Sequence, residues 1–194
     1  MARAGLNKEK IIEFAARKAN EIGISNVRLR GLATELGVQP ASLYSHVKNF
    51  DELKIGIMNY GWKQLEYRMI QDIAGVSGYD AVRVMCRSFY SYAVQNPGIF
   101  EVMLWYNKYV SDENNNATDD MFDVLYRIFK SVNVSRENAE HIIRTFRSFL
   151  QGFVMLVNNH SFGNPVSIEK SFEMSVEILI AGIKTFEDKK KNEF

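Results

Sequence analysis

The chain has 194 residues, 46% hydrophobic and 24% charged, a composition that fits a globular protein with its own core and excludes a disordered one. A single cysteine, Cys86, excludes an intrachain disulfide and favours a reducing, cytoplasmic location, and the sequence has neither a signal-peptide pattern nor the ~20 consecutive apolar residues of a membrane span. The net charge of +1 hides a basic beginning, since residues 1–50 hold eight Lys or Arg and four Asp or Glu, which suits contact with a polyanion.

Three helices are predicted in the first fifty residues. The first spans about residues 8–22, with Asn7 as its expected N-cap. The second, about 29–36, has one apolar stripe at helical spacing and is ended by Gly37. The third, about 40–46, begins with Pro40, which is tolerated at the first helical position. A supporting helix, a short helix, a glycine turn and a second short helix form the layout of a helix-turn-helix.

The third helix has the side chains that a major-groove helix needs. Only Leu43 and the following Val47 are expected to pack inward, and the other residues are small or form hydrogen bonds. Basic residues at the start of the second helix and just after the third suit phosphate contacts. Two alternatives stay open: the tyrosine could be a core aromatic, and the arginines could be solvated surface charges. The predicted DNA-binding residues are Arg28, Arg30, Pro40, Ala41, Ser42, Tyr44, Ser45, His46 and Lys48.

Six more helices are predicted, at about residues 50–73, 80–95, 97–109, 119–131, 136–158 and 168–188. Asn49 and Glu52 have the spacing of a capping box, and Ser135 and Ser167 are expected to cap the last two helices. The Asn-rich stretch 111–120 is predicted to be an exposed loop. No strand is predicted, so the fold class is all-α with about nine helices. The expected domains are a DNA-binding head in residues 1–50 and a ligand-binding and dimerisation body in 51–194, connected by the fourth helix.

The last two predicted helices are apolar around most of their circumference, so each is expected to be buried on more than one side. A second subunit is the natural cover, which predicts a homodimer with a two-fold four-helix interface. The alternative is a monomer with these two helices at its centre. The predicted interface residues are Phe149, Phe153, Leu156, Phe172, Val176, Leu179 and Ile183.

Three stretches resemble the TetR family of bacterial regulators: residues 6–16, the Leu-Ala-x-x-Leu-Gly-Val pattern within 30–38, and Leu-Tyr-x-His within 43–49. This resemblance covers about residues 6–65, in order and at the family's spacing. Farther along, residues 96–104 and 147–153 are similar to the C-terminal domain of a TetR subgroup described by a Trp-His-Gly motif. Gln151 stands where that subgroup has its histidine, and of the motif only Gly152 is kept.

The resemblance implies roles for four residues of the head. Tyr44 is expected on a phosphate or thymine, Ser42 on a base or phosphate, Arg30 on a guanine, and His46 near the DNA backbone. The family's usual lysine in the first turn of the fourth helix is replaced by Phe50, which leaves Lys48 as the candidate for that phosphate contact. The resemblance further implies a homodimeric repressor on a palindromic double-stranded DNA operator.

An effector cavity in the body is also implied by the resemblance. Residues 79–160 are dense in aromatic residues and methionine, a pattern that is more often core than pocket but also suits an apolar cavity with a few polar points. The predicted ligand is a small apolar or aromatic molecule, with Gln151 as one polar contact. The predicted pocket residues are Phe89, Phe100, Met103, Tyr106, Phe122, Gln151 and Met155.

Catalysis is not expected. The sequence has no Gly-rich phosphate loop, metal-ligand cluster or nucleophile elbow, so we predict no enzymatic activity, cofactor or metal. Glu137 and His141 share a helical face, but one such pair does not make a metal site. Cys86 lies among apolar residues in a predicted helix and is expected to be buried. A helical module that binds protein in place of DNA is the other alternative.

Overall fold

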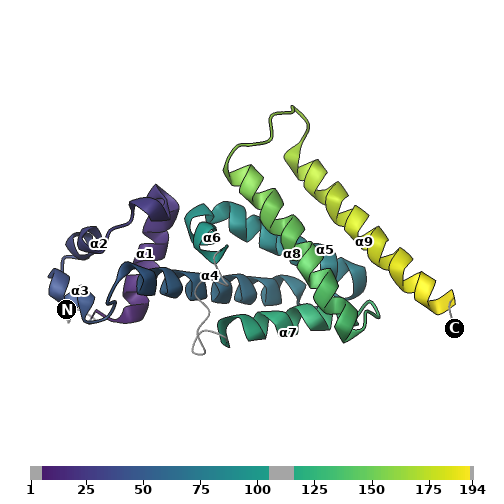
Figure 1. Cartoon of the computed structure of the whole chain (residues 1–194), viewed down its shortest axis with the longest axis horizontal. Coiled ribbons are helices and arrows are strands. Elements are labelled where there is room, and N and C mark those ends of the chain that lie inside the picture. Colours follow the sequence, from purple (N-terminus) through teal and green to yellow (C-terminus); the bar gives the residue numbers. More distant parts are fainter. Residues whose placement is uncertain (1–5, 105–115, 193–194) are drawn as a thin grey trace. The chain divides into compact units, whose positions relative to one another are not determined.

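The computed structural model describes residues 6–104 and 116–192 (Figure 1). Over these residues it consists of helices without strands, so the predicted all-α class is confirmed. The helices are α1 (Lys8–Ile22), the short 3-10 helix η1 (Ile24–Asn26), α2 (Leu29–Glu35), α3 (Pro40–Tyr44), α4 (Phe50–Ile73), α5 (Gly78–Gln95), α6 (Pro97–Met103), α7 (Asn116–Lys130), α8 (Arg136–Asn158) and α9 (Ile168–Asn192). None of the described helices is long and apolar enough to cross a membrane.

The predicted helix starts rest on local capping, and the structure confirms the caps. Asn7 accepts a hydrogen bond from the Lys10 N–H at 2.9 Å at the start of α1, and Ser135 and Ser167 do the same at the starts of α8 and α9. Residues 111–115 of the predicted loop lie outside the described residues, and the loop prediction was wrong from residue 116 on, because α7 begins at Asn116 and not at about residue 119. Polar residues are compatible with the first turn of a helix as well as with a loop.

Contacts within the chain divide it into two compact units. The first unit contains residues 1–64 and 95–118, and the second contains 65–94 and 119–194. Helix α6 therefore belongs to the same unit as α1, α2 and α3, although it lies far along the chain from them. The predicted division at residue 50 is a division by function, into a DNA-binding head and a ligand-binding and dimerisation body, and it stays a prediction.

In the first unit, α6 packs against α1 with an unusually close approach of the two backbones. A Cβ atom built on Gly98 would lie 1.9 Å from the carbonyl oxygen of Ala19, so only glycine fits there. Asn20 then caps α6 from another helix: its Oδ1 accepts the Ile99 N–H at 3.0 Å, and its Nδ2 donates to Asn96 Oδ1 at 2.9 Å. A helix N-terminus that lacks its own side-chain cap is satisfied in this way by α1.

The second unit has an aromatic centre formed by α5, α8 and α9. Phe172 of α9 is only 2% exposed. Its ring stacks on Tyr90 of α5 with centroids 4.3 Å apart, and it also contacts Phe149 and Phe153 of α8. Cys86 of α5 is buried as predicted, and this burial raises the pKa of its thiol, so the reactive thiolate form is disfavoured.

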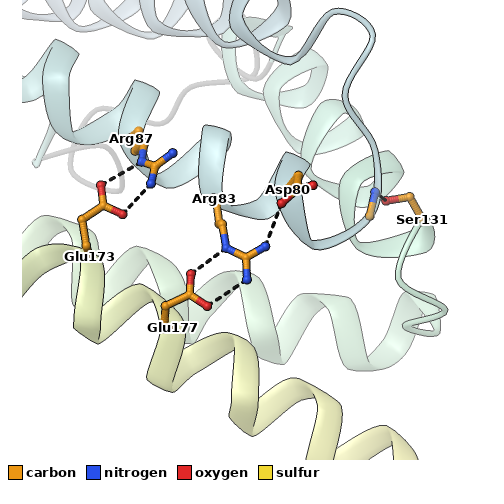
Figure 2. A network of polar contacts seen from close by, with 7 residues as sticks. Asp80, Arg83, Arg87, Ser131, Glu173 and Glu177 are labelled. Carbon is orange, nitrogen blue, oxygen red and sulfur yellow. Dashed lines mark hydrogen bonds and ion pairs between the residues drawn. The ribbon is translucent and has the colours of Figure 1, made fainter.

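Two parallel arginine–glutamate pairs connect α5 to α9 at the surface of the second unit (Figure 2). Arg83 binds Glu177 through Nε–Oε1 (2.6 Å) and Nη2–Oε2 (2.8 Å), and it also contacts Asp80. Arg87 binds Glu173 through two bonds of 2.7 Å. These bidentate hydrogen bonds lower the pKa of both glutamates.

We expect the glutamine variant Arg83→Gln to be less stable at neutral pH and equal to the unchanged protein in acid. Exposed pairs contribute about 0.2–1 kcal/mol, and the bidentate geometry puts this one toward the upper end. A carboxylate with a lowered pKa stabilises the fold above its ordinary pKa and loses that contribution as pH falls through the lowered value. Thermal unfolding between pH 7 and pH 3 measures the difference. Arg144→Gln is the control, since Arg144 is exposed on α8 and pairs with none of the described residues. A difference that persists in acid would contradict the explanation.

Candidate nucleic-acid interface

The turn between α2 and α3 is fixed by backbone hydrogen bonds. Gly37 has φ 66°, and its N–H donates to the carbonyl of Thr34, while the Val38 N–H donates to the carbonyl of Ala33. This pair of bonds is the Schellman motif, which needs a left-handed residue at the position of Gly37. Pro40 starts α3 shortly afterwards, so the angle between the two short helices is set locally.

The two faces of α3 differ as the sequence predicted. Leu43 and the following Val47 are both 0% exposed and anchor the helix in the first unit. Tyr44 is 40% exposed, and Ser42 is also exposed, so the tyrosine is not a core aromatic. Neither the Ser42 nor the Tyr44 hydroxyl makes a hydrogen bond within the described part of the chain. Both hydroxyls are therefore available to a ligand outside the protein.

The remaining predicted contacts on α3 form the rest of this surface. Pro40, Ala41 and Ser45 are exposed, and His46 is half-buried. Ser45 Oγ donates to the Ser42 carbonyl at 2.8 Å, which occupies its proton but leaves its lone pairs. Gln39 precedes the helix without a side-chain cap, which fits the weak capping preference of glutamine.

The two predicted arginines have different environments. Arg28 donates from Nη1 to the carbonyls of Ser25 (2.6 Å) and Val27 (2.9 Å), so its guanidinium stabilises the chain just before α2. Arg30 is exposed, and its guanidinium makes no hydrogen bond or ion pair with another described residue. Of the two, Arg30 is the one that is free to reach an anion.

The start of α4 is fixed by three bonds around Glu52. The Glu52 N–H donates to Asn49 Oδ1 at 2.8 Å, as the predicted capping box requires. Its carboxylate, however, accepts the N–H of Lys48 (2.8 Å) in place of that of Asn49, and also binds Lys8 Nζ (2.5 Å). The Lys8 hydrogen bond is the main cause of the lowered Glu52 pKa. Lys48 is thereby held in place by its backbone while its side chain stays exposed.

The predicted effector residues lie in both compact units. Phe100 and Met103 on α6 are buried in the first unit. The second unit holds buried Phe89, half-buried Phe122 and Gln151, and exposed Met155, while Tyr106 lies outside the described residues. The Gln151 side-chain nitrogen is buried without a hydrogen-bond partner among the described residues, which is unusual for a buried polar group.

Ser88 on α5 is a second buried polar residue without a hydrogen-bond partner among the described residues, and it was not predicted from the sequence. It is 2% exposed, and its hydroxyl oxygen has no hydrogen-bond partner in the described part of the chain. A signal was available, because Ser88 follows Met85 by three residues and precedes Tyr92 by four, so it shares their inward face. Like Gln151, it is a buried polar group in the second unit.

The predicted dimer residues divide into inward-facing and outward-facing sets. Phe172, Val176 and Ile183 are between 1% and 5% exposed, so they pack within their own chain and leave almost no surface for a partner. Of the other predicted residues, Phe149, Phe153 and Leu179 are half-buried and Leu156 is exposed. Helices α8 and α9 expose Leu156 together with apolar side chains that were not predicted as interface residues. These are Met155, Leu156, Met174, Ile178 and Phe186, which we call the outer apolar face. A cavity of about 470 Å³ lies between the first half of α8 and the second half of α9, and Ile178 and Phe186 line it.

Residues 82–179, about half of the chain, match the family described as tetracyclin repressor-like, C-terminal domain. The chain belongs to the TetR family. It is 26% identical over 183 residues to the helix-turn-helix regulator YobS of Bacillus subtilis (strain 168), covering 93% of this chain and 94% of YobS. It is 30% identical over 162 residues to the regulator Rv0681 of Mycobacterium tuberculosis (strain H37Rv), covering 79% of this chain and 71% of Rv0681.

Among solved structures, a single-residue variant of TetR from Acinetobacter baumannii AYE in complex with minocycline superimposes with a TM-score of 0.72 at 18% identity, covering 94% of this chain and 98% of that one. This similarity shows the fold. Together the matches make the chain a TetR-like helix-turn-helix transcriptional regulator.

Proposed function

We propose that this TetR-family regulator is a repressor that binds a palindromic operator as a homodimer in the cytoplasm. A small apolar or aromatic effector releases it. The observation that carries the DNA-binding part is the exposed face of α3, where Ser42 and Tyr44 present hydroxyls that no described residue occupies. Arg30 supports it as an exposed guanidinium near the start of α2.

A gel-shift with the duplex upstream of the regulator's own gene tests this proposal. Phosphate contacts by Lys and Arg release counterions, so we expect the affinity to fall steeply as salt is raised. In a dimer on a palindrome, the two α3 helices should sit about 34–36 Å apart, or a multiple of that distance, to reach successive major grooves. Binding that is absent at low salt, or that ignores salt, would count against the proposal.

The proposed subunit contact uses the outer apolar face. Met174 and Ile178 of α9 are 66% and 64% exposed, and Leu156 of α8 is 40% exposed. Large apolar side chains that cluster on the surface of two adjacent helices favour a partner. A two-fold arrangement of α8 and α9 would bury them in a four-helix interface.

Ile178→Asp should convert the protein to a monomer, because it places a charge in the centre of this contact without touching the core of its own chain. Multi-angle light scattering after size-exclusion chromatography measures the change. Val166→Asp is the matched control, since Val166 is 63% exposed but lies between α8 and α9 and not on the outer apolar face. An Ile178→Asp protein that keeps the mass of the unchanged one would contradict this interface.

The proposed release mechanism runs through α6. Phe100 and Met103, two of the proposed effector contacts, lie on α6, whose first turn is capped by Asn20 of α1. An effector that favours another position of α6 would therefore pull on α1, which supports α2 and α3. Gln151 is the proposed polar contact of the effector, because it stands where the Trp-His-Gly subgroup has its histidine. Thermal-shift screening with apolar and aromatic compounds tests the effector class.

A further inference from the structure

A cavity in the second unit lies apart from every proposed contact with DNA, effector or partner. It has a volume of about 240 Å³ and lies where the end of α4 and the link to α5 meet α7. Its wall is mainly apolar, formed by Ile70, Ile73, Val76, Ala81, Val124 and Ile128. Ile70 is 44% exposed and Ala74 beside it is also exposed, so the cavity opens to the surface along α4.

A hydrogen bond at one end holds the two walls together. Ser131, in the turn after α7, accepts the Gly78 N–H at 3.0 Å and donates to the Ile128 carbonyl at 2.6 Å. Figure 2 shows Ser131 reaching the start of α5. This bond fixes the end of α7 to the start of α5, so the cavity is a preformed feature of the fold.

One cation borders this apolar wall. Arg127 of α7 lines the cavity, is exposed, and makes no ion pair or hydrogen bond with its guanidinium among the described residues. Other arginines of this unit, such as Arg83 and Arg87, are bound by carboxylates. A guanidinium binds a planar carboxylate through two parallel hydrogen bonds. A carboxylate at the edge of this apolar wall would therefore suit Arg127.

We propose that this cavity binds a medium-chain carboxylic acid, with its hydrocarbon tail among the apolar side chains and its carboxylate on Arg127. The volume is below the ~300–1,000 Å³ of sites for drug-sized ligands, which favours a short single chain. The inference is independent of the proposed function, because none of the residues assigned to DNA, effector or partner lines this cavity.

Calorimetric titration of the full chain with sodium octanoate tests the proposal. We expect saturable binding of one octanoate per chain, with affinity rising about fourfold per methylene from hexanoate to octanoate as more tail is buried. Octanol, with the tail but no charge, and acetate, with the charge but no tail, should both bind at least tenfold more weakly. If octanol or acetate binds as tightly as octanoate, the assigned contacts are wrong.

Two variants locate the octanoate, and a third is their control. Arg127→Gln removes the charge and should weaken binding about tenfold, while Ala74→Phe fills the mouth of the cavity and should abolish binding. Lys130→Gln, an exposed charge one turn farther along α7 that does not line the cavity, should change affinity less than twofold. Thermal unfolding of each variant checks that it is folded. If the unchanged chain does not bind octanoate, or if Arg127→Gln or Ala74→Phe binds it as tightly as the unchanged chain, the proposal is wrong.

Discussion

Replacing Tyr44 by alanine should weaken operator binding by about 10- to 100-fold, equivalent to about 1–3 kcal/mol for one lost specific contact. Tyr44 projects from α3 with 40% of its surface exposed, and its hydroxyl contacts no described residue. The hydroxyl is therefore expected to act through contact with DNA. Because part of the ring is buried, we also expect a loss of about 1 kcal/mol in the free energy of unfolding, which leaves the protein folded in the binding assay. Fluorescence anisotropy with the upstream duplex measures the affinity.

A second tyrosine supplies the matched control. Tyr67 of α4 is 67% exposed and is no part of the proposed DNA surface, so Tyr67→Ala should leave the affinity unchanged. Lys48→Ala should act differently from Tyr44→Ala: it should weaken binding to all sequences alike and reduce the salt slope by about 1. If Tyr44→Ala binds the upstream duplex as tightly as the unchanged protein at every salt concentration, α3 is not the helix that contacts the bases.

Gly98→Ala should be the most destabilising single methyl addition in the first unit. Its Cβ would lie 1.9 Å from the Ala19 carbonyl oxygen and 2.7 Å from the Asn20 backbone nitrogen, and backbone atoms cannot rotate away as a side chain can. Separation of α6 from α1 would then break the hydrogen bond from Ile99 N–H to Asn20 as well. We expect a loss of about 3 kcal/mol in the free energy of unfolding, of the size seen for overpacked cores.

Chemical denaturation measures this loss, and Gly31→Ala is its control. Gly31 lies inside α2, where an added Cβ would meet nothing within 4 Å, so alanine there should be neutral or stabilise by up to about 1 kcal/mol. Asn20→Ala should lie between the two, because it removes the cap of α6 without forcing the helices apart. A Gly98→Ala protein as stable as the unchanged one would show that α6 can shift without cost.

The DNA-facing residues could be predicted from the sequence, but the dimer residues could not. The DNA-facing residues could be selected because α3 is a short helix anchored by Leu43 and the following Val47, which leaves its small and hydrogen-bonding side chains to face outward. The dimer residues could not be selected in the same way. On α9, apolar residues occupy both faces, so the pattern indicates burial on two sides without saying which side belongs to the chain itself. Phe172, a predicted interface residue, lies in the aromatic centre of the second unit. Ile178 is exposed and was not among the predicted interface residues.

Most helices, and the ends that have a local cap, could be predicted from the sequence, because capping residues such as Asn7 and Ser135, the glycine of the α2–α3 turn and the helical spacing of apolar residues act within a few residues of one another. The start of α7 at Asn116 could not, since polar residues fit a loop as well as a helix. The packing of α6 against α1 could not be predicted from the sequence and is seen in the fold alone. This packing depends on the absence of a side chain at Gly98 opposite Ala19, a contact between positions far apart in the chain. Local patterns carry no information about such a contact, since it arises from packing between helices and not from the preference of either one.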